Sequence, residues 1–257
     1  MSHYKAIAEY YDAEYEHQTM LEHDVPFFLG HLPKKKQSVL ELATGTGRAA
    51  IPVAQAGHGI VGVDFDPDML EIARRKRDAV GIKPRQLELI QADVMKLDLG
   101  RRFDWVCIFF NTMLSFARRR ELDAVMQTVR RHLKPRGRFW VDLFNPDLEL
   151  LAHKHSKHLD PAVFYVPALD RTVHRETEIV ADIVNQLQHV TFHYRWFDEQ
   201  GQPHDQRVEF DMTFIFPREL QLLLELHGMT IERLYGNYDG SGLTNNSPRI
   251  IALCKLL

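Results

Sequence analysis

The chain contains 257 residues, of which 45% are hydrophobic, and its 32 Lys and Arg residues are balanced by 35 Asp and Glu residues, which gives a formal net charge of -3. This length suits one large domain with a buried core, and the charge balance offers no excess of positive charge for a nucleic-acid partner. No stretch approaches the roughly 20 apolar residues that a membrane-spanning helix needs. Because both cysteines, Cys107 and Cys254, lie in apolar runs, we expect a cytoplasmic protein in a reducing compartment.

From residue 37 to residue 145, short apolar runs alternate with longer helical patterns. The runs typical of buried strands are 38–43, 59–64, 86–93, 103–110 and 138–144. The helical patterns between them are 49–57, 67–81 and 118–134. Near-continuous apolar strands separated by helices predict a parallel sheet that is covered on both faces. We therefore expect an α/β fold with a Rossmann-like, doubly wound core.

After residue 155 the pattern changes to long segments in which polar and apolar residues alternate, and these are 172–184, 186–197 and 207–216. Such alternation predicts antiparallel strands. The chain then continues with a helix and two further strands, predicted over 217–228, 229–236 and 248–256. We expect one domain over residues 1–257, in which a β-rich insertion (155–216) separates the core (37–145) from a C-terminal helix and strand pair (217–257).

Gly45 and Gly47 follow the first predicted strand in the stretch VLELATGTGR, residues 39–48. Glycines at this spacing allow the backbone to approach a ligand closely. Residues 45–50 also satisfy the permissive dinucleotide pattern G-x-G-x-x-G/A, and Asp64 lies where a ribose-binding acid belongs. The glycines alone therefore leave two cofactors open, a nicotinamide dinucleotide and S-adenosylmethionine.

Three carboxylates favour the second cofactor. Glu41 lies on the strand just before the glycine turn, where a carboxylate would repel a pyrophosphate but attract a sulfonium and an ammonium group. Asp64 ends the second strand and is placed to accept hydrogen bonds from ribose hydroxyls, while Met69 on the next helix could cover an adenine face. Asp93 follows the third strand and suits the adenine amino group.

At these residues the chain resembles the class I S-adenosylmethionine-dependent methyltransferases, through the ordered motifs ELATGTG, VDFD and QADV. The resemblance covers about residues 37–145 and 217–257. It implies a seven-stranded sheet in the order 3-2-1-4-5-7-6, with strand 7 antiparallel, and S-adenosylmethionine as the methyl donor, which becomes S-adenosylhomocysteine. Ala43 stands where a glycine is commoner. The cofactor-binding residues that the resemblance and the motifs imply are Tyr11, Glu41, Ala43, Gly45, Gly47, Asp64, Phe65, Met69, Asp93, Val94 and Phe110.

The methyl acceptor is predicted to be a small molecule. Methyltransferases that act on nucleobase amines usually carry an Asn/Asp-Pro-Pro-aromatic tetrad after strand 4, whereas this chain has Phe110-Asn111-Thr112-Met113 there. We expect a methyl transfer to nitrogen or oxygen in which Tyr11, Asn111 and Tyr238 orient the reactants. Amino-sugar methyltransferases often have a histidine shortly after strand 4, but this chain has Ser115 in that neighbourhood.

Acceptor contacts are expected from both ends of the chain. Residues 1–32 resemble the N-terminal lid helices of small-molecule methyltransferases, and Tyr11 and Tyr15 are four residues apart, so they share one helical face. The insertion would roof the acceptor site, and the loop 236–249 could present Arg249 as a carboxylate or phosphate clamp. The predicted substrate contacts are Tyr15, Ser115 and Arg249.

Two clusters of charged residues do not by themselves predict a site. His153, His155 and His158 have no acidic or cysteine partners beside them, so we predict no metal site there. The arginines of 118–138 are typical of the solvated side of an amphipathic helix. A nicotinamide-dependent oxidoreductase and a noncatalytic cofactor-binding protein remain the alternatives, and the sequence predicts no membrane partner and leaves the oligomeric state open.

Overall fold

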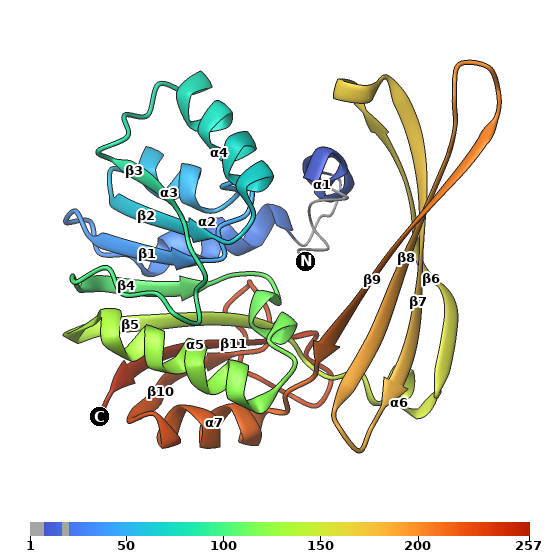
Figure 1. Cartoon of the computed structure of the whole chain (residues 1–257). Coiled ribbons are helices and arrows are strands. Elements are labelled where there is room, and N and C mark those ends of the chain that lie inside the picture. Colours follow the sequence, from blue (N-terminus) through green and yellow to red (C-terminus); the bar gives the residue numbers. More distant parts are fainter. Residues whose placement is uncertain (1–7, 17–20) are drawn as a thin grey trace. The chain divides into compact units, whose positions relative to one another are not determined.

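The computed structural model describes residues 8–16 and 21–257 (Figure 1). The chain forms two compact units. Unit 1 contains the helix α1 (Ala8–Tyr15) and residues 146–214, and unit 2 contains residues 22–145 and 215–257. The insertion predicted over 155–216 thus corresponds to most of unit 1. Residues 1–7 and 17–20 of the predicted lid segment lie outside the described residues.

Unit 2 is built on a seven-stranded sheet in the order β10-β11-β5-β4-β1-β2-β3. Strands β1 to β5 run parallel, and β11 is antiparallel to both β5 and β10. This order confirms the predicted 3-2-1-4-5-7-6 arrangement with an antiparallel seventh strand. The strands are β1 (Ser38–Leu42), β2 (Gly59–Asp64), β3 (Leu87–Gln91), β4 (Phe103–Ile108), β5 (Leu133–Phe144), β10 (Met229–Tyr235) and β11 (Arg249–Leu256).

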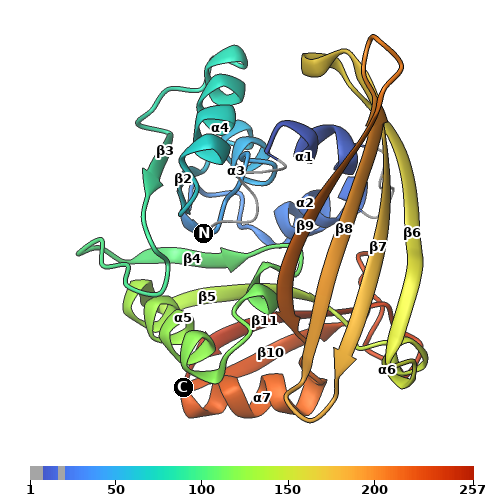
Figure 2. The same cartoon turned by 45° about the vertical axis from the view of Figure 1, so that its right-hand side comes forward.

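Helices flank this sheet, as the doubly wound pattern predicts. Helices α3 and α4 pack beside β2 and β3, whereas α5 and α7 lie near one another beside β4, β5 and β10 in both views (Figures 1 and 2). His227 at the end of α7 bonds Asp123 of α5 through Nε2 and Oδ1, 3.1 Å apart. The helices of unit 2 are α2 (Leu21–His31), α3 (Ala50–Gln55), α4 (Pro67–Ala79), the 3₁₀ helix η2 (Thr112–Ser115), α5 (Arg119–His132) and α7 (Pro217–Leu226).

Helix α2 is a core helix of unit 2. Phe28 is fully buried, and its ring meets those of Trp105, Phe109 and Trp140 edge-on at centroid distances of 5.0 to 5.6 Å. Edge-to-face packing at this separation is the favoured geometry for aromatic pairs. The second helix of the predicted lid segment therefore packs against the strands of the sheet.

Unit 1 consists of a four-stranded antiparallel sheet, order β6-β7-β8-β9, with α1 packed on one face (Figure 2). Three of its strands were predicted from alternation, and β6 was not. The buried face gathers Tyr10 and Ala13 of α1 with Val173, Tyr194 and Val208 of the strands. The elements are β6 (His155–Val166), β7 (Arg171–Asp182), β8 (Leu187–Phe197), β9 (Pro203–Thr213), α6 (Leu148–Ala152) and the 3₁₀ helix η3 (Pro167–Leu169).

Candidate functional site

The predicted cofactor residues of unit 2 gather at one edge of the seven-stranded sheet. The carboxyl ends of β1, β2, β3 and β4 lie side by side at this edge because the four strands are parallel and paired in register. The loops after them carry the glycine turn, the VDFD motif, Asp93 and Phe110. Ligands of open α/β sheets bind at this edge, where the strand order reverses.

In the turn after β1, three alternate residues have left-handed backbone angles. Ala43 has φ +58°, Gly45 has φ +55° and Gly47 has φ +78°. A Cβ on Gly47 would lie 3.3 Å from the Cβ of Ala73 in α4, so this glycine is needed for packing. A Cβ on Gly45 would meet no atom within 4 Å. Gly45 is therefore required by its backbone angle and faces open space, as expected of a turn that receives a ligand.

Glu41 is buried beside this turn, with 3% of its surface exposed. Its Oε2 accepts a hydrogen bond of 2.7 Å from the hydroxyl of Thr44. Thr44 fits because Gly62 on β2 has no side chain, since a Cβ there would lie 2.8 Å from the Thr44 oxygen. Burial raises the pKa of Glu41 to about 8, although the Thr44 hydrogen bond and Arg48 act in the opposite direction. A nearby cation would restore the ionised form.

Asp64 fixes the shape of both neighbouring loops. Its Oδ2 accepts from the backbone N–H of Gly45 at 2.7 Å, and its Oδ1 accepts from the N–H of Asp66 at 2.9 Å. Burial raises the pKa of Asp64, while these backbone hydrogen bonds oppose the shift. Each carboxylate oxygen has a further lone pair that could accept from a ribose hydroxyl. Asp64 is thus both a turn residue and a candidate ligand contact.

The residues predicted at the adenine end differ in burial. Met69 and Val94 are 2% and 6% exposed, whereas Phe65 is 61% exposed. Asp93 accepts from the backbone N–H of Met95 at 2.9 Å, as a loop-capping acid does. Asp66, which the sequence analysis did not single out, caps α4 by accepting from the N–H groups of residues 68 and 69. An N-cap aspartate of this kind stabilises a helix by about 1 kcal/mol.

After β4, Phe110 and Asn111 adopt left-handed backbone angles, with φ +45° and +63°. Two successive non-glycine residues in this region are unusual, and each costs about 1 kcal/mol or more. Asn111 offsets the cost by linking β4 to β5, because its Oδ1 accepts from the N–H of Phe144 at 2.6 Å and its own N–H donates to the carbonyl of Asp142 at 2.9 Å. Asn111 is therefore held firmly at the edge of the sheet.

Asp142 links Asn111, Tyr238 and Arg249, although the sequence motifs did not point to it. It is fully buried on β5, its Oδ2 accepts from the hydroxyl of Tyr238 at 2.6 Å, and its Oδ1 accepts from Nε of Arg249 at 3.0 Å. Burial, followed by the Asp142 charge, raises the pKa of Tyr238 well above its usual range. The signal in the sequence was a carboxylate inside the apolar strand RFWVDLF, since a buried charge needs a partner.

The predicted clamp role of Arg249 does not fit this arrangement. Its side chain is completely buried and its guanidinium is bound to Asp142. The guanidinium also lies 4.6 Å from the centroid of the Phe144 ring and 5.5 Å from that of Phe110. Arg249 therefore holds Asp142 and the aromatic rings in place.

A second buried carboxylate lies on α2. Asp24 is 1% exposed and binds Arg48 through two hydrogen bonds of 2.8 and 2.6 Å, and Arg48 lies 5.6 Å from the Phe110 ring centroid. Fork-to-fork pairs of this kind give geometric specificity as well as energy. The pair fixes Arg48, which immediately follows the glycine turn. Sequence reasoning missed Asp24 because its partner is distant in the sequence.

In unit 1, the rings of Tyr11 and Tyr15 lie 4.7 Å apart on α1, which confirms that they share one helical face. Glu14 on the same helix is buried, and its Oε2 accepts from the hydroxyl of Tyr194 at 2.8 Å. Its Oε1 lies 3.0 Å from Nε of Arg175, at ion-pairing distance but without the angle of a hydrogen bond. A charged pair therefore joins α1 to the face of the antiparallel sheet.

The remaining predicted positions are simpler. Ser115 is half-buried at the end of η2. His155 and His158 lie on β6 and pair with Glu178 and Glu176, so the acidic partners that the sequence analysis did not find come from the adjacent strand. Within 8–16 and 21–257, no three His, Cys, Asp or Glu residues gather as metal ligands. In the same ranges, no helix has the length and apolarity to cross a membrane.

The residues at the carboxyl edge fit S-adenosylmethionine. Gly45 leaves open space beside a left-handed turn, and the buried carboxyl group of Glu41 has the Thr44 hydroxyl as its hydrogen-bond donor. A cationic group would stabilise that carboxylate, whereas a pyrophosphate would be repelled by it. The residues that would hold the cofactor are Glu41, Gly45, Gly47 and Asp64, and when bound it would supply an electrophilic methyl group on a sulfonium.

Comparisons with known proteins agree with this assignment. A family profile described as a methyltransferase domain matches residues 39–137. The cypemycin N-terminal methyltransferase of a Streptomyces species is 25% identical over 231 residues, which are 90% of this chain and 88% of that protein. The dTDP-3-amino-3,6-dideoxy-alpha-D-glucopyranose N,N-dimethyltransferase of Streptomyces fradiae is 32% identical over 136 residues, 51% of this chain and 50% of that protein.

A solved structure also shares the fold. The S-adenosylmethionine-dependent methyltransferase from Clostridium acetobutylicum superposes with a TM-score of 0.77 at 20% identity, covering 99% of both chains. The matched profile and all three proteins are methyltransferases by name. Neither the nicotinamide-dependent oxidoreductase nor the noncatalytic alternative is supported.

Proposed function

We propose that this chain, which belongs to the class I S-adenosylmethionine-dependent methyltransferases, transfers the methyl group of S-adenosylmethionine to an amine nitrogen of a small-molecule acceptor. The observation that carries the cofactor assignment is the buried carboxyl group of Glu41 beside the open glycine turn. The amine acceptor is inferred from two relatives whose names specify an N-terminal amine and an amino sugar. We further propose a cytoplasmic location.

The reaction needs alignment more than covalent assistance. A lone pair of the acceptor attacks the methyl carbon as the bond from carbon to sulfur breaks, and the positive charge leaves the sulfur. Holding the reactants in line in a dry site supplies effective molarities of about 10⁵ M or more. The side chains must therefore fix the acceptor, exclude water and leave the attacking nitrogen unprotonated.

Tyr238 suits the orienting role because its hydroxyl group donates its proton to Asp142. Its hydroxyl proton is committed to Asp142, so the Tyr238 oxygen presents lone pairs, which accept from the N–H of an amine. Asn111 carries an amide whose oxygen is committed to Phe144, so its NH₂ group is the part that can reach a reactant. Tyr11, Tyr15 and Ser115 remain proposed contacts, and Arg249 is reassigned to positioning Asp142.

Two measurements test the proposal. Calorimetry should show S-adenosylmethionine and S-adenosylhomocysteine binding at micromolar concentration, about -8 kcal/mol, without heat from NADH. A methyl-transfer screen with labelled cofactor should then compare free amines, such as an amino sugar or a peptide with a free N-terminus, with their N-acetylated counterparts. Methylation of the acetylated forms would favour oxygen as the acceptor atom, and NADH binding without either thioether ligand would refute the cofactor assignment.

A further inference from the structure

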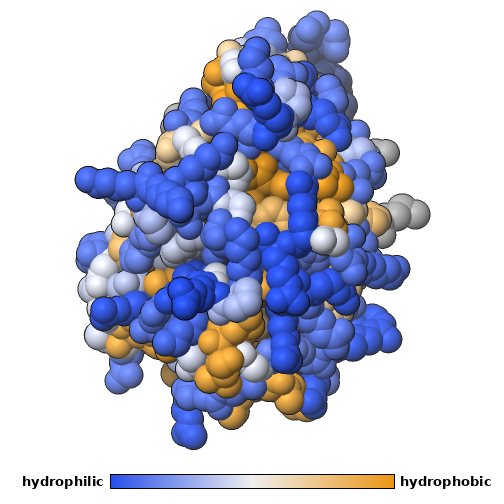
Figure 3. Space-filling view, turned by 90° about the vertical axis from the view of Figure 1, so that its left-hand side faces the viewer, coloured by the Kyte–Doolittle hydropathy of each residue, from blue (hydrophilic) through white to orange (hydrophobic). Residues whose placement is uncertain are grey.

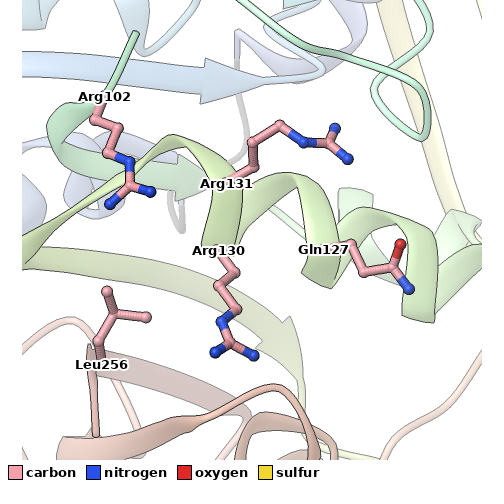
Figure 4. A pocket seen from close by; sticks show the side chains of 5 residues that line it. All are labelled: Arg102, Gln127, Arg130, Arg131 and Leu256. Atoms are coloured by element: carbon pink, nitrogen blue, oxygen red, sulfur yellow. The ribbon is translucent and has the colours of Figure 1, made fainter. Parts of the chain in front are cut away.

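A hollow of about 480 Å³ lies at the opposite edge of the same sheet from the candidate cofactor site (Figure 4). Arg102 immediately precedes β4, and Leu256 ends the antiparallel strand β11. Both therefore lie at the amino-terminal edge of the parallel strands, and Figure 3 shows that hydrophilic side chains dominate the face on that side. The hollow is lined by Arg102, Gln127, Arg130, Arg131 and Leu256.

The three arginines differ in their acidic partners. Among residues 8–16 and 21–257, neither Arg102 nor Arg130 has a carboxylate within ion-pairing distance. Arg131 differs, since its Nη1 donates to the carbonyl of Leu97 at 2.6 Å and its Nε lies 3.8 Å from Asp98. In Figure 4 the side chain of Arg102 extends toward Leu256 and that of Arg130 extends down from α5 to one side of Leu256, while that of Arg131 extends away from both. Within the described part of the chain, the hollow thus combines two guanidinium groups that no carboxylate neutralises.

The guanidinium of Arg130 lies beside a glycine turn. Gly228, in the turn between α7 and β10, has φ +70°, and a Cβ on it would lie 3.5 Å from the guanidinium carbon of Arg130. The guanidinium therefore packs over the backbone of this turn. A group packed in this way loses less conformational entropy when it binds a ligand than an extended arginine does.

We propose that this hollow binds a small ligand that carries a phosphate or diphosphate group. Arginine forks match phosphate oxygens in a bidentate geometry, which explains a site built from Arg102 and Arg130 rather than from lysines. The amide of Gln127 adds a donor, and Leu256 provides an apolar wall for the remainder of the ligand. The volume lies in the range of small-ligand sites, and the chain has no overall positive charge to hold a polyanion.

Inorganic pyrophosphate is the probe for this site. Calorimetry on the full chain should be done in about 50 mM salt, at which exposed charges are only partly screened. It should show saturable binding of pyrophosphate at submillimolar concentration. Arg102→Gln and Arg130→Gln should each weaken that binding by about tenfold or more, the effect of losing one charged hydrogen bond. Both residues are exposed, so the thermal stability of each variant should match that of the parent.

Arg101→Gln is the matched control, because Arg101 is adjacent to Arg102 but is already paired with Glu88. The proposal is supported if this control binds pyrophosphate as the parent does. It is overturned if the control loses affinity equally, which would indicate attraction to net charge alone, or if the parent binds no pyrophosphate. Saturating S-adenosylhomocysteine should leave pyrophosphate affinity unchanged, and competition between the two would place pyrophosphate at the cofactor edge and refute the assignment.

Discussion

Cofactor binding should expel a proton from Glu41. With a pKa of about 8, this carboxyl group is about 90% protonated at pH 7 in the absence of a cation, by the ordinary titration relation. A sulfonium or ammonium group beside it favours the ionised form and lowers the pKa. Ionising the group at pH 7 then costs about 1.4 kcal/mol, because one pKa unit corresponds to 1.36 kcal/mol.

The affinity for S-adenosylmethionine should therefore rise about tenfold between pH 6 and pH 7, and calorimetry measures it directly. Titrations at pH 7 should be done in phosphate and in Tris, whose ionisation enthalpies differ. Because close to one proton is released, the two binding enthalpies should differ by nearly the whole difference between those ionisation enthalpies. Glu41→Gln is the control, since it keeps the shape of the side chain and any titration of the ligand but removes the proton. Equal heats in the two buffers for the unmodified protein would refute the reasoning.

The same group makes a prediction about stability. The folded pKa of Glu41 lies above the unfolded value, so its contribution to stability is fully present below the unfolded pKa and is lost as the pH rises through about 8. Between pH 6 and pH 9 the loss amounts to about 2 to 3 kcal/mol in the cofactor-free protein. Denaturant titrations should show the free energy of unfolding falling by that amount, relative to Glu41→Gln. A constant difference between the two proteins across this range would contradict the assignment of the shift.

Three further substitutions test the site and the packing. Asp64→Ala should weaken cofactor binding about tenfold to a hundredfold in calorimetry. It should also lower the melting temperature, because the N–H of Gly45 loses its acceptor. Unchanged affinity would exclude the ribose contact. Ala43→Gly should raise the melting temperature by about 2 °C, since relief of the left-handed strain exceeds the entropy cost of a glycine. A melting temperature below that of the unmodified protein would show that Ala43 is not strained. Glu14→Ala should cost about 2 kcal/mol of unfolding free energy, because the buried Arg175 keeps only the exposed Asp160 as an acidic partner and the Tyr194 hydroxyl loses its acceptor. Adding Arg175→Met should recover part of that loss, and two additive losses would contradict the coupling.

Much of the fold followed from local pattern. Strands buried on both faces, helices between them and a glycine turn after β1 are properties of short stretches, and the positive φ values at Gly45 and Gly47 bear out the turn. The exception is β6, which the alternation did not reveal. It contains Pro161, left-handed residues at His158 and Asp160, and two register shifts against β7. Such bulges break the two-residue period on which strand prediction depends.

The sequence by itself determined which side chains lie at or near the carboxyl ends of the strands, because the order of motifs places Glu41, Asp64 and Asp93 at one edge. Only the tertiary structure decided what those groups and their neighbours bind. Asp142 and Arg249 are 107 residues apart in the chain, yet both are fully buried and each neutralises the other. The need to pair a buried charge can be inferred from sequence, but the choice of partner depends on which strands lie side by side, and that is settled by packing over the whole unit.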